Sequence, residues 1–164
     1  MATLAGRQSD VRRMLGSLIL LEYDAIAAYT VAIDRLKDVK LKTAFEGFRA
    51  DHMRHVRELA HELGRLGWRV PEHADLKAVL TKGKVYLGSL ASDKGILMAM
   101  KSNENDCNSA FDHALDNDAT GSELASLLQQ NLADERRHRR WIGDQLSSMH
   151  VERRGPRREQ QREL

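Results

Sequence analysis

The 164-residue chain contains few of the residues that interrupt helices or cross-link small domains. It has one cysteine, two prolines, three tyrosines, three phenylalanines and two tryptophans. A single cysteine excludes an intramolecular disulfide. Valine, isoleucine and threonine together number 18, against 22 leucines and 18 alanines. Because leucine and alanine favour helices, whereas β-branched residues favour strands, this composition predicts an all-α protein.

The chain also lacks a strong net charge and the features of a secreted or membrane protein. Its formal net charge is +2, from 26 basic and 24 acidic residues. Nucleic-acid-binding domains usually carry a basic excess, so nucleic acid is not the expected partner. Residues 1–10 have neither the basic start nor the apolar run of a signal peptide, and we expect no apolar run long enough to span a bilayer. The sequence therefore predicts a cytoplasmic protein without a membrane partner, folded around a single core.

Two segments in the second half of the chain repeat two segments in the first half. Residues 50–55 (ADHMRH) and 133–138 (ADERRH) share an Ala-Asp pair, an Arg and a final His. Residues 22–29 (EYDAIAAY) and 104–111 (ENDCNSAF) share a Glu, an Asp, an Ala and a closing aromatic residue. The repeat predicts one helical hairpin that occurs twice. Each hairpin carries a Glu on its first helix and a pair of ligand-type residues, spaced i and i+3, on its second.

Apolar residues that recur at steps of three and four predict four helices, over about residues 10–36, 39–66, 93–115 and 121–149. The expected capping residues are Ser9 or Asp10, Asp38, Ser92 or Asp93, and a capping box formed by Thr120 and Glu123. Residues 67–93, with a weakly helical piece over 75–90, are interpreted as a crossover along the bundle. We expect an antiparallel four-helix bundle over residues 9–150, between an N-terminal tail at 1–8 and a disordered Arg-rich tail at 151–164.

Six polar side chains interrupt the apolar stripes near the middle of the four predicted helices. They are Glu22, His52, His55, Glu104, Glu135 and His138. In a bundle these positions share one level and face inward, and no Lys or Arg occupies a stripe position. Buried carboxylates without a fixed cation are unfavourable by several kcal/mol. Bound divalent metal ions or three protonated histidines would supply the missing positive charge, and the repeated arrangement of ligand-type residues favours metal.

These residues resemble the di-metal motif of the ferritin-like four-helix bundles, in which two helices provide a Glu each and the other two a Glu-x-x-His each. Over about residues 9–149 the chain is similar to the rubrerythrin-like bacterial branch of that superfamily, and to its small families without an assigned function. The resemblance implies terminal carboxylate ligands at Glu22 and Glu104, imidazole ligands at His55 and His138, and a bridging carboxylate at Glu135.

His52 stands where the resemblance places a second bridging Glu. A neutral imidazole offers one lone pair to one metal ion, whereas a carboxylate can span two, so a dinuclear centre would keep one protein bridge. The sequence leaves open an asymmetric dinuclear site, a mononuclear site and a zinc site. Asp51 and Asp134 lie about 100° off the stripe. They either orient a ligand His or are surface charges, and the sequence favours neither interpretation.

Three other features near the predicted site have simpler interpretations. Tyr29 lies two turns from Glu22, and its repeat mate is Phe111, so packing is favoured over electron or proton donation. Cys107 is expected to behave as a small apolar residue. The arginines beside His138 are predicted to form a solvated helix face.

The resemblance also implies a chemistry, because in such proteins a reduced di-iron centre reacts with dioxygen or peroxide, for iron storage or peroxide removal. The implied cofactor is iron, one or two ions per chain, with manganese or zinc as alternatives, and the enzymatic interpretation is an oxidase or peroxidase. Without a Cys-x-x-Cys pair, electrons would come from an external donor. A homo-oligomer is expected. The competing interpretation is a non-enzymatic stress or interaction protein with a mononuclear, zinc or empty site.

Overall fold

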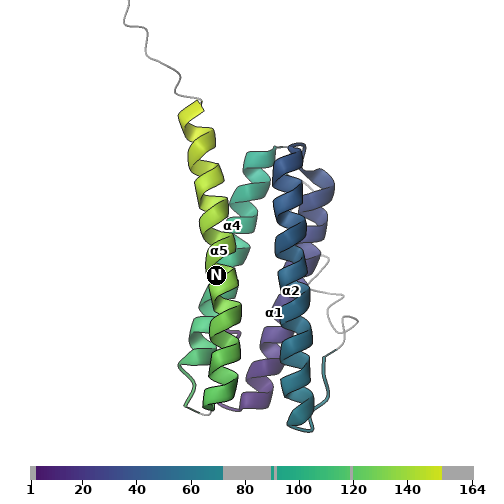
Figure 1. Ribbon diagram of the computed structural model, residues 1–164, viewed down its shortest axis with the longest axis vertical. Helices are drawn as coiled ribbons and strands as arrows, with labels where there is room; N and C mark the ends of the chain where they lie inside the picture. Colours follow the sequence, from purple (N-terminus) through teal and green to yellow (C-terminus); the bar gives the residue numbers. More distant parts are fainter. Residues whose placement is uncertain (1–2, 72–89, 91, 119, 153–164) are drawn as a thin grey trace, which may run out of the picture.

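Four long helices packed side by side make up the described part of the molecule (Figure 1). The structure is a computed structural model and describes residues 3–71, 90, 92–118 and 120–152. The helices are α1 (Val11–Arg35), α2 (Val39–Arg65), α4 (Asp93–Leu115) and α5 (Ser122–Glu152). α1 and α5 run in one direction, and α2 and α4 in the other (Figure 1). The predicted all-α antiparallel four-helix bundle is confirmed, and no strand occurs among the described residues.

Three of the four helices begin at the capping residues that the sequence predicts. Asp10, Asp38 and Ser92 each accept a hydrogen bond from backbone N–H groups in the first turn of the helix that follows. These bonds satisfy donors that would otherwise lack an intrahelical partner. α2 ends at Arg65, and Gly67 just beyond its cap has a φ of 68°, the left-handed conformation that glycine adopts readily. Local sequence therefore sets these boundaries.

The predicted start of α5 is wrong. The hydroxyl of Thr120 donates to the carbonyl oxygen of Ala114 at 3.0 Å, at the end of α4. The first helical bond of α5 runs instead from the N–H of Ala125 to the carbonyl oxygen of Gly121, at 2.9 Å. Gly121 therefore occupies the capping position, and Thr120 closes the preceding helix.

The helix ends agree with the predicted crossover, because α2 ends and α4 begins at opposite ends of the bundle (Figure 1). The weak helix predicted over 75–90 lies outside the described residues, apart from residue 90. The predicted disordered tail begins one or two residues too early, since α5 continues through Glu152. The rest of that tail, residues 153–164, lies outside the described residues.

A carboxylate at the start of α4 fixes the two hairpins against each other. Asp93 accepts hydrogen bonds from the N–H groups of Lys37 and Asp38 at 3.0 and 2.9 Å, in the turn between α1 and α2. The contact joins positions more than fifty residues apart in the sequence. It therefore sets the height of α4 relative to α1, and with it the level of the Glu on each of these helices.

The apolar core has two clusters, one on each side of the middle of the bundle. In α1, the first cluster takes buried residues from 14–19 and the second takes residues from 29–36. Burying one large apolar side chain contributes about 1.5–3 kcal/mol. Prominent members of the first cluster are Leu15, Leu59, Leu63, Phe111 and Leu128, and of the second Tyr29, Phe45, Leu97, Met100 and Ile142. Glu22 and its polar neighbours lie between the two clusters.

α1 departs from the expectation that no apolar run is long enough to span a bilayer. Its most apolar 18-residue window has a mean hydropathy of 1.4, and by length and composition the helix could cross a membrane. In the bundle, 39% of that window is buried. Core helices of bundles meet the same criteria, since they too need a long apolar stripe.

Candidate metal centre

The six polar side chains predicted from the repeat meet between the two apolar clusters. All four helices contribute, and each side chain is completely inaccessible to solvent: Glu22, His52, His55, Glu104, Glu135 and His138. These six residues are called the polar layer below. Within the described part of the chain no Lys or Arg is buried with them. The sequence thus located a closed, charged layer, while the binding of metal by these residues stays a prediction.

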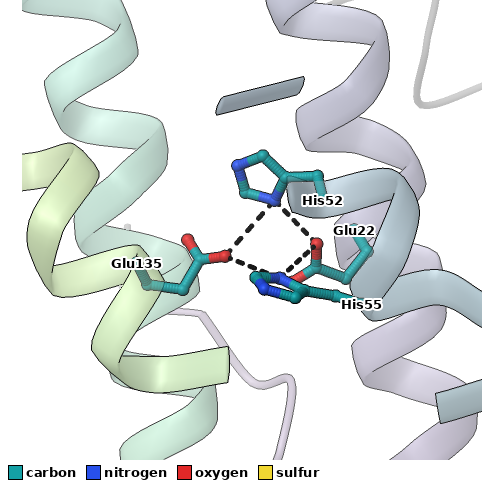
Figure 2. Close-up of side chains that lie close together, drawn as sticks. All are labelled: Glu22, His52, His55 and Glu135. Atoms are coloured by element: carbon teal, nitrogen blue, oxygen red, sulfur yellow. Dashed lines mark hydrogen bonds and ion pairs between the residues drawn. The ribbon is translucent and has the colours of Figure 1, made fainter. Parts of the chain in front are cut away.

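The polar layer contains two overlapping groups of candidate ligands. The first donor set is Glu22, His52, His55 and Glu135, with ligand atoms that all lie within 4.8 Å of one another. In this set the Nδ1 atom of His52 lies 2.7 Å from Glu22 Oε2 and 3.3 Å from Glu135 Oε1 (Figure 2). His55 Nδ1 lies 3.5 and 3.2 Å from the same two oxygens.

The second donor set meets the same distance criterion and comprises His52, Glu104, Glu135 and His138. Here His52 presents its other nitrogen, because Nε2 lies 3.5 Å from Glu104 Oε1. His138 Nδ1 lies 3.7 Å from Glu104 Oε2. His52 and Glu135 therefore belong to both sets, and each set adds one further Glu and one further His.

Many inward-facing atoms of the polar layer have no hydrogen-bond partner among the described residues, although several are close enough for ion pairs. They are Glu22 Oε1, His52 Nε2, His55 Nδ1, Glu104 Oε2, both oxygens of Glu135, and His138 Nδ1. A buried polar atom without a partner costs about 1–3 kcal/mol. Carboxylate oxygens with imidazole nitrogens suit divalent iron, manganese or zinc. The arrangement could therefore hold metal ions, which would pair these atoms.

Two aspartates from the repeated hexamers orient two of the three histidines of the polar layer. His138 Nε2 lies 3.1 Å from Asp51 Oδ2, and His55 Nε2 lies 3.4 Å from Asp134 Oδ2. A carboxylate that accepts the Nε2 proton of a histidine leaves the lone pair on Nδ1, which here faces the layer. Of the two interpretations left open by the sequence, the structure favours the orienting one.

Two arginines link these aspartates by ion pairs, a role that was not predicted from the sequence. Arg54 Nη1 lies 2.7 Å from Asp51 Oδ1, and Arg137 Nη2 lies 2.6 Å from Asp51 Oδ2. Both arginines also pair with Asp134. The signal was an Asp-x-x-Arg in both hexamers, which places each Arg one turn after its Asp. The side chain of Arg137 is about half exposed. It also belongs to the ring of Asp51, Asp134 and the two arginines around the polar layer, called the rim below, so the predicted solvated face is only partly solvated.

The three carboxyl groups of the polar layer have different proton affinities. Burial raises the pKa of Glu135 to about 8; the charge of His52 opposes this effect, while Glu22 and Glu104 add to it. Burial also acts to raise the pKa of Glu104, but the nearby imidazoles of His138 and His52 hold it below its usual range. The pKa of Glu22 is lowered in the same way, chiefly by His52. Without metal, Glu135 is therefore the carboxyl that carries a proton at neutral pH.

For the histidines His52 and His55, burial acts to lower the pKa, and the neighbouring carboxyl groups raise it. Burial acts to lower the pKa of His55, yet the adjacent carboxyl groups of Glu135 and Glu22 raise it to about 10. The pKa of His52 is raised well above 6.5, because the charges of Glu135 and Glu22 outweigh burial. Without metal, His52 and His55 thus carry protons and pair with the carboxylate of Glu22. Metal ions must displace these protons to bind.

Tyr29 has a polar role in addition to the packing role predicted from the sequence. Its hydroxyl donates to Glu104 Oε1 at 2.5 Å, and its ring packs edge-on against Phe45 with a centroid distance of 5.0 Å. Burial raises the pKa of Tyr29, and the charge of Glu104 adds to this effect, so the hydroxyl keeps its proton. The repeat mate Phe111 offers no such donor to Glu22.

Comparison with protein families adds one finding. The family described as Domain of unknown function (DUF2383) matches residues 10–118, about two-thirds of the chain. The chain belongs to this family. The DUF2383 match includes α1, α2 and α4, and ends before α5. It therefore contains Glu22, His52, His55 and Glu104, whereas Glu135 and His138 lie beyond it. A search of the curated proteins found no match, and a search of the solved structures found none.

Proposed function

We propose that this protein is a ferritin-like metal protein of the rubrerythrin type, whose polar layer binds two divalent iron ions for iron handling or for defence against peroxide. The observation that carries the proposal is the pair of overlapping donor sets, in which many of the buried carboxylate and imidazole atoms have no hydrogen-bond partner among the described residues. Four-helix bundles with a Glu on two helices and ligand pairs on the other two are the usual scaffold for such sites.

The size of the donor sets supports the proposal. Bonds of about 2.1 Å place two ligand atoms at most about 4.2 Å apart. The ligand atoms of each set lie within 4.8 Å of one another, so small side-chain movements would close each set around an ion. The apolar clusters on both sides of the layer keep bulk water away from it.

Iron held by carboxylates and histidines would supply the reduction of dioxygen or peroxide when bound. The protein's own residues have three roles in this proposal. Glu22 and Glu104 provide fixed negative charge, Asp51 and Asp134 hold the imidazoles in place, and Tyr29 holds a proton at Glu104 Oε1. A cytoplasmic homo-oligomer that takes electrons from an external donor completes the proposal.

The experiment that tests the proposal is anaerobic loading with Fe(II), removal of excess metal, and measurement of iron per chain by elemental mass spectrometry. The loaded protein is then mixed with dioxygen or hydrogen peroxide while its absorbance is recorded. We expect about two irons per chain and an oxidant-dependent absorbance change. Glu135→Gln should lose both results. Glu46→Gln should lose neither, because Glu46 is exposed on α2. Failure of the native protein to retain iron would contradict the proposal.

One observation favours the competing, non-enzymatic function. His52 Nδ1 already makes a hydrogen bond to Glu22 Oε2 at 2.7 Å, so the metal-free layer is partly satisfied. A bundle stabilised in this way needs no metal. For that function, the thermal unfolding midpoint should be the same with iron and with a chelator. Glu104→Ala should lower this midpoint, and neither the native protein nor the variant should show turnover.

A further inference from the structure

The ring of His52 lies between the two donor sets. Figure 2 shows one ring nitrogen among Glu22, His55 and Glu135, and the other nitrogen pointing away from them. The first nitrogen, Nδ1, lies 2.7 Å from Glu22 Oε2, and the second, Nε2, lies 3.5 Å from Glu104 Oε1. Each nitrogen therefore faces a different donor set.

His52 is unlike the other two histidines of the polar layer in this respect. His55 and His138 turn Nδ1 inward and direct Nε2 to Asp134 and Asp51 on the rim. The Nε2 atom of His52 has no hydrogen-bond partner among the described residues and is completely buried. Of the three histidines, only His52 has both nitrogens inside the layer.

The net charge of the layer with two metal ions bound also directs attention to His52. Two divalent ions carry four positive charges, and the carboxylates Glu22, Glu104 and Glu135 carry three negative charges when ionised. A net charge without a counter-charge is strongly unfavourable in a site closed from solvent. Deprotonation of His52 would supply the fourth negative charge and make the filled layer neutral. The equivalent position in the other hairpin, Glu135, supplies its charge as a carboxylate.

We propose that His52 bridges the two metal ions as an imidazolate, binding one ion through each ring nitrogen. This inference rests on the proposed metal binding. His52 is protonated in the metal-free layer, so one ring proton first passes to solvent, and the first ion takes the lone pair of the neutral imidazole that remains. The second ion takes the electron pair left when the remaining N–H bond breaks, and that proton passes to solvent. His52 then replaces a bridging carboxylate in both charge and reach, and Glu135 is the second group shared by the two sets.

The test uses zinc, because Zn(II) is diamagnetic and binds the same classes of ligand. The full chain, labelled with ¹⁵N in its histidine rings, is loaded with zero, one and two zinc ions, and its ring ¹⁵N and N–H resonances are recorded by NMR. A His52→Ala variant assigns the His52 signals. With two zinc ions bound, we expect His52 to have no ring N–H and two ¹⁵N shifts in the metal-bound range. His55 and His138 should keep one N–H each, directed to Asp134 and Asp51.

The outcomes separate this inference from the function on which it rests. Two zinc ions bound while His52 keeps a ring N–H would overturn the bridge alone. Binding of a single zinc ion at saturation would also overturn the bridge. If no zinc is retained, both the bridge and the proposed metal binding are wrong.

Zinc affinities provide a second measurement that does not depend on assigning spectra. Loss of a bridge should weaken both sites, so His52→Ala should lower both zinc affinities by at least about tenfold. His138→Ala should affect chiefly one of the two sites. His52→Glu should bind two zinc ions more tightly than His52→Ala does, because a carboxylate can also bridge two ions. His61→Ala is the matched control, because the side chain of His61 is 73% exposed on the same helix. An unchanged affinity at one site in His52→Ala would contradict the bridge.

Discussion

The two helical hairpins have the same construction and differ at the two positions that give the polar layer its asymmetry. Both carry a Glu on the first helix and an Asp, an Arg and a His on the second, and the rim contacts between Asp51, Asp134 and the two arginines are reciprocal. At the centre, however, His52 in the first hairpin corresponds to Glu135 in the second. The two hairpins therefore keep the same Asp and Arg residues around the polar layer, but differ in the central residue that belongs to both donor sets.

The second difference is Tyr29 in the first hairpin against Phe111 in the second. Tyr29 reaches across to the other hairpin, where Glu104 accepts a hydrogen bond from its hydroxyl. Glu22 instead forms a hydrogen bond with His52 Nδ1. Glu104 and Glu22 are therefore each held by a group from the first hairpin, and the second hairpin contributes Glu135, whose pKa is raised to about 8.

The largest expected effect comes from Glu135→Gln, because Glu135 belongs to both donor sets. Metal affinity should fall at both sites by at least about a hundredfold, beyond the usual effect of losing an outer partner. The metal-free protein should hardly change in stability, since the protonated acid and the amide are both neutral. Equilibrium dialysis with Co(II) and urea unfolding with a chelator measure the two effects. A large loss of metal-free stability would contradict a protonated Glu135.

Tyr29→Phe makes the two hairpins alike at the second differing position. Removing a buried hydrogen bond to a charged group costs about 1.5–3 kcal/mol. We expect a loss of that size in the free energy of unfolding of the metal-free protein, measured with urea. In a Glu104→Gln background the loss should be smaller, because the acceptor is no longer charged. Equal losses in both backgrounds would show that Tyr29 acts by packing alone.

Asp51→Asn and Asp134→Asn test whether the rim supports the two sites separately. Asp51 contacts His138 of the second donor set, and Asp134 contacts His55 of the first. Each variant should lower metal affinity about 10–100-fold at one site and leave the other nearly unchanged. Calorimetric titration with Zn(II) resolves the two sites. Identical effects of the two variants on both sites would mean that the rim acts as one unit.

The last prediction concerns the pH dependence of the metal-free bundle. The pKa of Glu135 is raised to about 8 and that of His55 to about 10, so both groups bind protons more tightly in the folded state. Their contributions to stability are complete below their unfolded values, and are lost as the pH rises through 8 and then 10. The thermal unfolding midpoint with a chelator should therefore fall as the pH rises from 7 to 10. The zinc affinity should increase as the pH rises from 6 to 8. A midpoint that increases over the first range would contradict these pKa directions.

The sequence predicted the helices and the polar layer because both depend on local periodicity. A stripe with a step of three or four residues defines the buried face of a helix, and residues such as Glu104 and His138 lie on that stripe. The caps Asp10 and Asp38 are likewise local, since they bond to backbone groups two or three residues away. Thr120 was misassigned because its hydroxyl has a competing acceptor in the preceding helix.

Contacts between helices could not be predicted in the same way. The hydroxyl of Tyr29 meets a carboxylate 75 positions away, and the contact of His138 with Asp51 spans 87 positions. Periodicity places such residues on a face, but the rotamers and the relative height of two helices decide which atoms touch. The placement of the two His52 nitrogens in different donor sets is of this kind. It emerged only from the packed bundle.

The most direct test of the central claim, that the polar layer binds two metal ions, is a crystal structure of the iron-loaded protein with anomalous diffraction at the iron edge. We predict two anomalous peaks in each chain. One should lie in the first donor set and the other in the second, with the ring of His52 between them. Density maps without a peak in the layer, or with peaks only at the protein surface, would contradict the claim.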